Sequence, residues 1–460
     1  MLPPRKPTSW LMRPVSAAPL VVFRVLFGAM MLASIARFAA KGWITDLYVA
    51  PKVFFPYYGF EWVQPAGAVG MHVVFSLMAL GALGILLGAW YRWSAVLFFL
   101  AFTYVELLDK TNYLNHYYFV SVVAFLLIWV PANVQFSLDA RWQPQRWRAT
   151  VPQWAGLLLR TQMGMVYFFA GVAKLNPDWL LEAMPLRLWL PAHTDLPLLG
   201  WFFDQLWVAY AFSWFGAFYD LTIPFFLSAR RTRYWAYATV VVVFHVLTAV
   251  LFQIGMFPYI MMVSTLLFFP ASFHEKLLGW GRRLLGRTAA TPVLASESVF
   301  APVAAPRGLV VALGLWLLVQ VLLPWRFVLY PGDLFWSEQG YRFSWRVMLM
   351  EKSGTAFFYV RDPRTGHETE IRNRDYLTVT QEKQVATQPD MLLQFAHILR
   401  DDFRRRGVPN PQVRAEAYVT LNGRSSRLLI NPKLDLAQQQ EGFGAKAWIL
   451  PLEQDEPAGK

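Results

Sequence analysis

The chain has 460 residues, of which 56% are apolar and only 15% charged, whereas about 25% of residues are charged in soluble domains. It contains no cysteine, which excludes disulfide-stapled scaffolds, thiolate metal sites and cysteine nucleophiles. The formal charge is +13, but residues 324–460 hold 19 basic and 17 acidic side chains, so the excess lies among the apolar runs and indicates membrane topology instead of a nucleic-acid-binding surface.

Apolar runs long enough to cross a bilayer follow one another along most of the chain and predict an α-helical polytopic membrane domain of about nine spans. The runs lie at residues 19–40, 69–89, 93–109, 116–134, 154–174, 207–228, 234–252, 254–270 and 308–323. The first run lacks a small-residue cleavage site, so we expect a retained span and no removable signal peptide. Four prolines in residues 175–206 predict a short re-entrant or interfacial element there.

Beyond the membrane helices of residues 1–288, an Ala-, Pro- and Ser-rich stretch at 289–307 predicts a linker to the last span. Residues 324–460 have the composition of a soluble domain, for which we predict a β-rich α+β fold. Its expected elements are strands at 356–360 and 415–421, a hairpin at Asn422-Gly423 and a helix at 391–405.

The basic residues between the spans predict the orientation of the chain. With a cytoplasmic N-terminus, 15 basic residues fall in the inner segments and 4 in the outer ones. Nine spans then place the C-terminal domain outside the cytoplasm.

Ionisable side chains inside apolar runs are candidates for function, because their burial in lipid is costly. Those in this chain are Arg24, Arg37, Glu106, Arg160, Lys174, Asp220 and His245, with Asn115 and His116 at the mouth of a span. In the nine-span topology Lys174, the Asn115-His116 pair and His245 lie toward the outer face, where we expect them to converge.

Structural interpretations of these groups stay open at this point. Lys174 at a helix end is equally consistent with a side chain that extends to the interface, and His116 with an ordinary interfacial histidine. His245 is consistent with a hydrogen bond between helices, and Asp220 and Arg160 with buried pairing groups. The chain has no Walker loop, dinucleotide fingerprint, zinc-protease or lipase motif, and its seven histidines lack metal-ligand spacing, so we expect no metal site.

Seven strings, spread in order over most of the chain, resemble the vitamin K-dependent gamma-carboxylases. They are Gly-Ala-Leu-Gly-Ile-Leu-Leu-Gly at 81–88, Leu-Leu-Asp-Lys-Thr with Asn-His at 107–116, Tyr-Phe-Phe-Ala-Gly-Val-Ala-Lys-Leu-Asn-Pro-Asp-Trp at 167–179, Ile-Gly-Met-Phe-Pro-Tyr at 254–259, Leu-Tyr-Pro-Gly-Asp at 329–333, Gly-Tyr-Arg-Phe-Ser-Trp at 340–345 and Asn-Pro-Lys-Leu-Asp-Leu at 431–436. The resemblance implies a lyase that couples oxygenation of vitamin K hydroquinone to its epoxide with the addition of CO2 to a protein glutamate.

The resemblance also implies roles for individual residues. Lys174 corresponds to the base that deprotonates the hydroquinone, and burial suits this role because it favours a neutral amine. Asn115 and His116 correspond to the pair that binds the quinol oxygen and stabilises its anion. His245 and Phe257 are placed with them at the cofactor, while Tyr341 and Trp345 resemble part of the region that receives the glutamate substrate.

The resemblance implies vitamin K hydroquinone as cofactor, O2 and CO2 as co-substrates, no metal, and a glutamate-containing peptide or protein as partner within membrane lipid. The animal members carry cysteines, including a disulfide, and a longer C-terminal tail, so the chain is expected to be a bacterial member in the inner membrane. Two rival functions stay open: a quinol epoxidase that carboxylates no protein, and a non-catalytic membrane receptor or transport component on the same scaffold.

Overall fold

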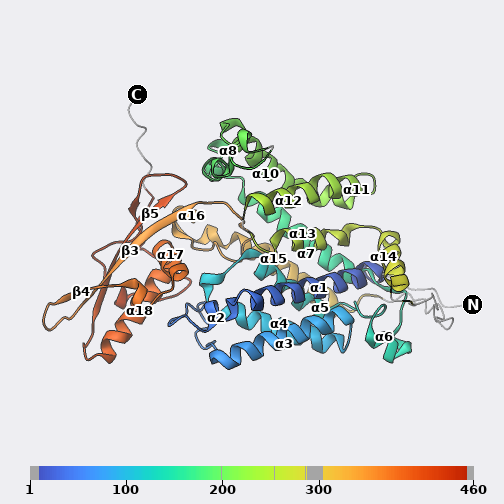
Figure 1. Cartoon of the computed structure of the whole chain (residues 1–460), viewed down its shortest axis with the longest axis horizontal. Coiled ribbons are helices and arrows are strands. Elements are labelled where there is room, and N and C mark those ends of the chain that lie inside the picture. The colour runs from blue at the N-terminus through green and yellow to red at the C-terminus, as the bar shows by residue number, and fades with distance from the viewer. Residues whose placement is uncertain (1–9, 198, 253, 285, 287–303, 453–460) are drawn as a thin grey trace, which may run out of the picture.

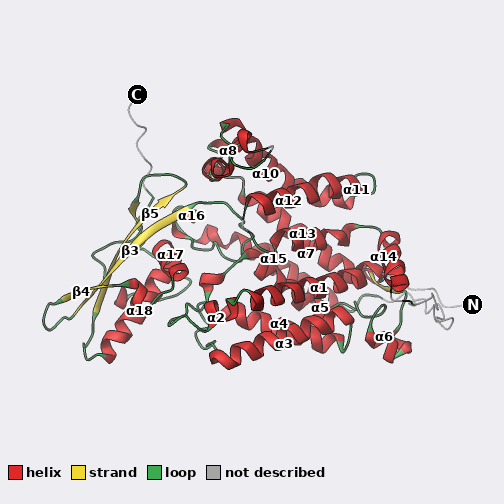
Figure 2. Cartoon of the chain, viewed as in Figure 1, coloured by secondary structure: helices red, strands yellow, loops and turns green. Residues whose placement is uncertain are grey.

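The computed structural model describes residues 10–452 except 198, 253, 285 and 287–303. The predicted linker at 289–307 falls largely outside these residues. Long helices make up the N-terminal part of the chain, and a smaller region with a sheet lies at one end of the molecule (Figures 1 and 2). This arrangement confirms the predicted order of a helical region followed by a smaller sheet-containing region.

Five long helices lie in the first half of the chain. They are α1 (Ala18–Ala40), α3 (Gly67–Leu87), α4 (Tyr91–Leu108), α5 (Asn115–Trp129) and α7 (Gln153–Ala173). Gly28 lets α1 approach α3 closely, since a Cβ atom at this position would lie 2.5 Å from the backbone nitrogen of Leu86. Arg24 is fully buried and donates hydrogen bonds to the carbonyl oxygens of Ile85 at 2.9 Å and Leu86 at 3.0 Å. Arg24 therefore satisfies the carboxyl end of α3, which is a structural role.

The other helices of the N-terminal part pack beside these five helices or connect them. They are α10 (Leu206–Ser228), α11 (Arg233–Trp235), a π-helical turn (Ala236–Val241), α12 (Val242–Leu251), α13 (Phe257–Thr265), α14 (Ala271–Leu284) and α15 (Arg307–Trp325), with the short helices α2 (Trp43–Tyr48), α6 (Leu138–Trp142), α8 (Pro177–Leu181) and α9 (Leu186–Trp189). Strands β1 (Pro14–Ser16) and β2 (Thr150–Pro152) pair in antiparallel fashion beside the start of α1.

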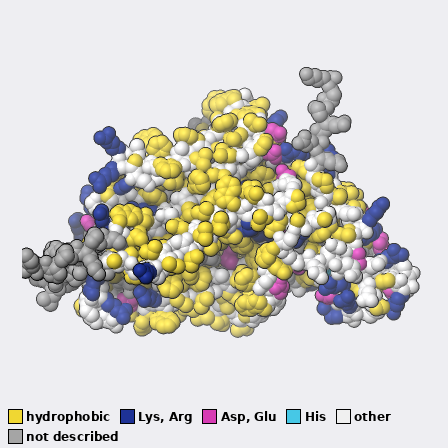
Figure 3. All heavy atoms as spheres, turned by 180° about the vertical axis from the view of Figure 1, so that it is seen from behind, with side chains coloured by type: hydrophobic (Ala, Val, Ile, Leu, Met, Phe, Trp, Pro, Cys, Tyr) yellow, Lys and Arg dark blue, Asp and Glu magenta, His cyan; other side chains and the backbone are white. Residues whose placement is uncertain are grey.

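Among the described residues, six helices are long and apolar enough to cross a membrane, or seven if α13 and α14, bent by 115°, count as one span. The predicted count of nine is therefore not confirmed. Helix α5 has 15 residues and is about 22 Å long, shorter than the roughly 30 Å hydrocarbon core. Helix α10 has 23 residues, but its tyrosines, tryptophans and serines and its one aspartate lower its mean hydropathy. Figure 3 shows hydrophobic side chains over the middle of the molecule and basic side chains toward its two ends.

The C-terminal region is built on a four-stranded antiparallel sheet in the order β4-β3-β5-β6. Its elements are α16 (Leu334–Ser337), β3 (Lys352–Arg361), β4 (Glu368–Ile371), α17 (Val379–Thr387), α18 (Pro389–Arg405), β5 (Gln412–Leu421) and β6 (Arg427–Leu428). Pairing of Tyr418 with Leu428 confirms the predicted hairpin, in which Asn422 and Gly423 adopt φ angles of 51° and 75°. The predicted strands and helix are likewise confirmed.

A partly buried ionic network joins the sheet-containing region to the helical region. The Asp390 carboxylate accepts from Lys110 Nζ at 2.8 Å and from Arg342 at 2.7 Å, so two cations from distant parts of the chain share one acid. Burial by itself raises the pKa of Asp390, but these two cations outweigh it and hold this pKa far below its usual range. At another contact between the two regions, Asp178 pairs with Arg424 at 2.6 Å. The predicted interfacial element at 175–206 thus contacts the C-terminal region through Asp178.

Asp390→Asn should loosen this contact and lower the stability of the whole chain. The substitution leaves Lys110 and Arg342 without their counter-charge, at an expected cost of about 1–3 kcal/mol in free energy of unfolding. The measurement is the thermal unfolding midpoint in detergent. Asp362→Asn, which removes an exposed ion pair with Arg364, is the matched control and should leave the midpoint unchanged. Equal midpoints for both variants would contradict the role given to Asp390.

Candidate functional site

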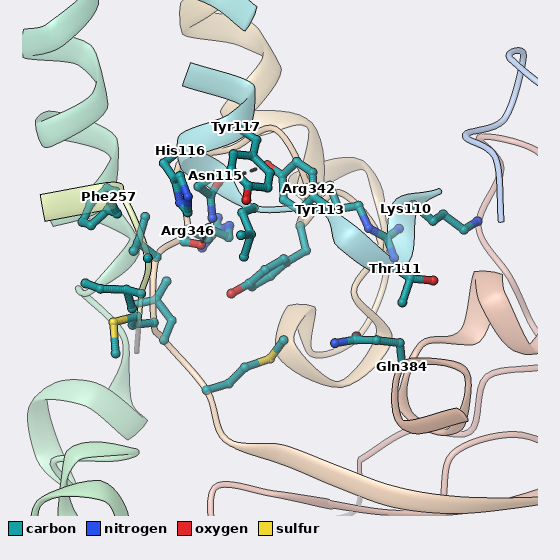
Figure 4. A pocket seen from close by; sticks show the side chains of 18 of the residues that line it. Lys110, Thr111, Tyr113, Asn115, His116, Tyr117, Phe257, Arg342, Arg346 and Gln384 are labelled. Carbon is teal, nitrogen blue, oxygen red and sulfur yellow. Dashed lines mark hydrogen bonds between the residues drawn. The ribbon is translucent and has the colours of Figure 1, made fainter. Parts of the chain in front are cut away.

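The largest group of polar side chains surrounds a cavity of about 590 Å³ between the helical region and the sheet-containing region. Asn115 and His116, at the start of α5, lie on one wall together with Arg346 (Figure 4). Lys110 and Gln384 lie across the cavity from them. Because its walls come from both regions, the cavity exists only when the two regions are docked. We call it the polar cavity.

A second, smaller cavity of about 90 Å³ has mostly apolar walls, contributed by α7, α10, α12 and α13. Lys174, Asp220 and His245 are the acidic and basic side chains in its lining. We call it the apolar cavity. Its position between helices suits a lipid-soluble ligand, because such sites bind through apolar contact with a few fixed polar groups.

Lys174 forms the carboxyl-terminal cap of α7 and is buried, with an exposed fraction of 6%. Its Nζ atom donates to Asp220 Oδ2 at 2.7 Å and to the carbonyl oxygen of Ala170 at 3.3 Å, and lies 5.3 Å from the ring centre of Trp179. The structure therefore places Lys174 inside the protein and not at the interface with its ammonium in water. The pairing role predicted for Asp220 is confirmed by the same contact.

His245 lies on the same cavity and is 1% exposed. Its Nε2 atom is within 3.2 Å of the Tyr167 hydroxyl and 3.3 Å of the Tyr219 hydroxyl, so three helices meet at this ring. Its Nδ1 atom is buried with no hydrogen-bond partner among the described residues. The network agrees with a hydrogen bond between helices and leaves one ring nitrogen available.

Asn115 uses its side chain to hold another segment of the site. Its Nδ2 group donates to the carbonyl oxygen of Arg346 at 2.6 Å, and its Oδ1 atom accepts from the Tyr113 hydroxyl at 3.1 Å. The Tyr113 oxygen in turn accepts from the backbone N–H of Phe343 at 2.7 Å. These contacts fix the segment 343–346 against the start of α5.

Phe257, the first residue of α13, separates the two cavities. Its ring centre is 6.0 Å from that of His116 and 5.9 Å from that of His245. Both cavities also share Ile254, Val347 and Met348 in their linings. The residues expected to converge are thus neighbours, but they border two adjoining cavities, with the Asn115-His116 pair on the polar one and Lys174 on the apolar one.

The two aromatic residues expected at the substrate differ in position. Tyr341 lines the polar cavity. Trp345 is 1% exposed, stacks on Tyr118 with ring centres 4.7 Å apart, and lines neither cavity. Its place is in the packing beneath the segment that forms the cavity wall.

Sequence reasoning missed the charged groups that the C-terminal region contributes. Arg342 and Arg346 both line the polar cavity, and Arg342 also reaches Asp390. Arg342 lies within the Gly-Tyr-Arg-Phe-Ser-Trp string and Arg346 directly follows it, so the signal was one arginine inside and one beside a string already selected for other reasons. Among the described residues, no group of three or more acidic or histidine side chains could hold a metal ion.

Comparison with family models agrees with this division of the molecule. Residues 12–273 match the HTTM domain, and residues 306–455 match the lumenal domain of the vitamin K-dependent gamma-carboxylases. The chain belongs to the vitamin K-dependent gamma-carboxylase family. No solved structure matches the chain.

Membership of the gamma-carboxylase family confirms the resemblance found in the sequence. The lumenal-domain match indicates that the sheet-containing region lies outside the cytoplasm, and the apolar helices indicate a membrane protein. Membership of this family implies a vitamin K cofactor and a glutamate-containing protein substrate.

A double-mutant cycle measures how strongly Lys174 and Asp220 depend on each other. Lys174→Met and Asp220→Leu should each lower the free energy of unfolding by about 3–5 kcal/mol, because each leaves one buried charge unpaired. The double variant should lose clearly less than the sum of the two, as measured by thermal unfolding in detergent. Phe218→Leu, on the exposed face of the same helix as Asp220, is the control and should have little effect. Additive losses would show that the two side chains are not coupled.

Proposed function

We propose that the protein is a gamma-glutamyl carboxylase that couples oxygenation of vitamin K hydroquinone to its epoxide with the addition of CO2 to a glutamate side chain of a protein. The observation that carries this proposal is the shared wall between the two cavities. The apolar cavity holds a buried lysine, the polar cavity faces the sheet-containing region, and Phe257 borders both. A lipid-soluble reactant and a water-soluble peptide can therefore meet without sharing one binding surface.

The lining of the apolar cavity matches the chemical character of a lipid-soluble quinol. Its walls are mostly apolar, and its acidic and basic side chains, Lys174, Asp220 and His245, can exchange or orient a hydroxyl proton. When bound, the hydroquinone with O2 supplies the oxidative driving force needed to remove a γ-proton of glutamate, which no amine could remove alone.

Lys174 acts in this proposal as the base toward the quinol hydroxyl, and Asp220 controls its proton. An ammonium has no lone pair, so Lys174 becomes a base only after passing a proton to a neighbouring acceptor. Asp220 is that acceptor, at 2.7 Å, and the apolar wall limits the energetic advantage of the charged pair over the neutral pair. The proton transfer from Lys174 to Asp220 requires no movement of α7 or α10.

Asn115, His116 and His245 serve as positioning groups in the proposal. Asn115 already holds the Arg346 carbonyl with one amide hydrogen. His116 faces Phe257 from the polar cavity, and His245 faces it from the apolar cavity, so both rings border the place where the two reactants meet. We assign Asn115 and His116 to a quinol oxygen that extends past Phe257 to the polar cavity, with Tyr341 on the side of the peptide.

We also propose a cytoplasmic N-terminus in a bacterial inner membrane, with the sheet-containing region in the periplasm. The excess of basic residues in the segments that the nine-span prediction assigns to the inner side supports this orientation. A reporter that is active only in the cytoplasm, fused after Lys460, should be inactive. Strong activity of this fusion would contradict the orientation.

One incubation tests the proposed reaction. Purified protein is given reduced vitamin K, O2, labelled bicarbonate and a glutamate-containing peptide, and epoxide and incorporated label are measured separately. Both products are expected. Epoxide without label would identify a quinol epoxidase that carboxylates no protein, and neither product from folded protein would indicate a receptor or transport component.

Variants of Lys174 test the base. Lys174→Ala should lower the rates of both products by about 10²- to 10⁴-fold, the usual contribution of a general acid-base group. Lys174→Arg should fail as well, because a guanidinium keeps the charge but does not deprotonate. The Phe218→Leu variant controls for changes to the surface near α10. Near-normal epoxide formation by both lysine variants would overturn the mechanism.

A further inference from the structure

Basic side chains outnumber acidic ones in the lining of the polar cavity, and two of the basic ones have no acidic partner among the described residues. Its lining contains five basic and two acidic side chains; the basic ones are Arg37, Lys110, Arg342, Arg346 and Lys352. Lys352 pairs with Glu338 at 2.9 Å, and Lys110 and Arg342 share Asp390. Glu351, the other acid, accepts from the indole N–H of Trp189 at 2.6 Å. Within the described residues, Arg37 and Arg346 are the lining cations without an ion pair.

Arg346 is an unusual case because it is buried without an acceptor. The residue is 8% exposed, and its Nε atom has no hydrogen-bond partner among the described residues. Its guanidinium carbon lies 4.4 Å from the ring centre of Phe327, so one face of the group is covered by an aromatic ring. Burial lowers the pKa of Arg346 to about 10, but the group stays charged at neutral pH. The covered face leaves the edge of the guanidinium, which carries the N–H donors, available to a ligand.

Arg37, which the helical region contributes to the lining, shows a similar arrangement. It projects from the last turn of α1, its guanidinium carbon lies 5.4 Å from the ring centre of Trp43, and its Nε atom is buried without a partner among the described residues. Two guanidinium groups, each stacked on its own aromatic ring, therefore line the polar cavity. Each has an N–H donor without a hydrogen-bond partner among the described residues.

The backbone that carries Arg346 is strained. Phe343, Trp345 and Met348 have φ angles of 60°, 58° and 53°, a region that side chains larger than glycine rarely adopt. Each such residue costs about 1–3 kcal/mol, and the strain persists only where the surroundings enforce it. The hydrogen bond from Asn115 to the Arg346 carbonyl is part of that enforcement. This segment is thus held in a fixed conformation at the cavity wall.

We propose that Arg346, assisted by Arg37, binds the side-chain carboxylate of the substrate glutamate in the polar cavity. A guanidinium edge offers two parallel donors that match the two oxygens of a carboxylate. Val347 and Met348, which directly follow Arg346, form part of the wall shared with the apolar cavity. A carboxylate on Arg346 therefore brings the adjacent γ-carbon toward that wall. The assignment of glutamate rests on the proposed function, whereas the carboxylate site rests on the two unpaired arginines.

Equilibrium binding without quinol tests this site. Two short peptides that differ only in one glutamate or glutamine are titrated against the full chain in detergent. The wild type should bind the glutamate peptide about 10- to 100-fold more tightly, the range expected for charged hydrogen bonds. Arg346→Met should abolish this preference, and Arg346→Lys should recover only part of it because lysine lacks the planar fork. Arg364→Gln, an exposed arginine outside the cavity, is the control and should keep the preference.

Thermal unfolding separates binding from folding. Arg346→Met removes a buried charge that has no acidic partner, so its unfolding midpoint should equal or exceed that of the wild type. A lower midpoint together with an unchanged peptide preference would overturn the proposal, because Arg346 would then have only a structural role.

The outcomes distinguish this site from the proposed reaction. An unchanged peptide preference in Arg346→Met, with normal carboxylation by the wild type, would refute the carboxylate site and leave the function standing. A preference that depends on Arg346, in a protein that makes no carboxylated product, would support the site and refute the function. If Arg346→Met altered only the dependence on bicarbonate, the site would bind bicarbonate and the glutamate assignment would be wrong.

Discussion

The sharing of Asp390 by Lys110 and Arg342 is the interaction on which the rest of the arrangement depends. Lys110 follows α4, Arg342 precedes the sheet, and the carboxylate lies at the start of α18, so this contact joins three separate parts of the chain. It holds the segment that follows Arg342 against the ends of the membrane helices. The polar cavity is the space left between them, and without this docking it would be open surface.

The second constraint is the separation of the two cavities by Phe257. One cavity lies among apolar helices, and the other faces a region whose surface carries many charged side chains. Reactants of opposite polarity need different solvation, so a single mixed cavity would serve both poorly. Phe257 and the other residues shared by the two linings keep the apolar and the polar environment apart. Lys174 and Arg346 lie on opposite sides of these residues.

Charges in this protein are handled in two ways. Arg24, Lys174 and Lys110 donate hydrogen bonds to carbonyl groups or carboxylates, which accounts for their burial in structural terms. Arg346 has no such partner among the described residues, and aromatic stacking compensates it only in part. An uncompensated buried cation on a strained backbone is destabilising, and this cost is most readily understood if a ligand carries the missing negative charge.

The sequence by itself determined the class of the molecule, because apolar runs, strand alternation and the Asn422-Gly423 turn are local signals. It also selected Asn115, His116, Lys174, His245 and Phe257, which the structure places close together. It did not determine the number of spans, since the length of α5 and the bend after α13 depend on packing. Only the tertiary structure decided which charges are paired, because Asp220 lies 46 residues from Lys174 and Asp390 lies 280 residues from Lys110. Charge pairing depends on distances in space, and a sequence pattern does not contain these distances.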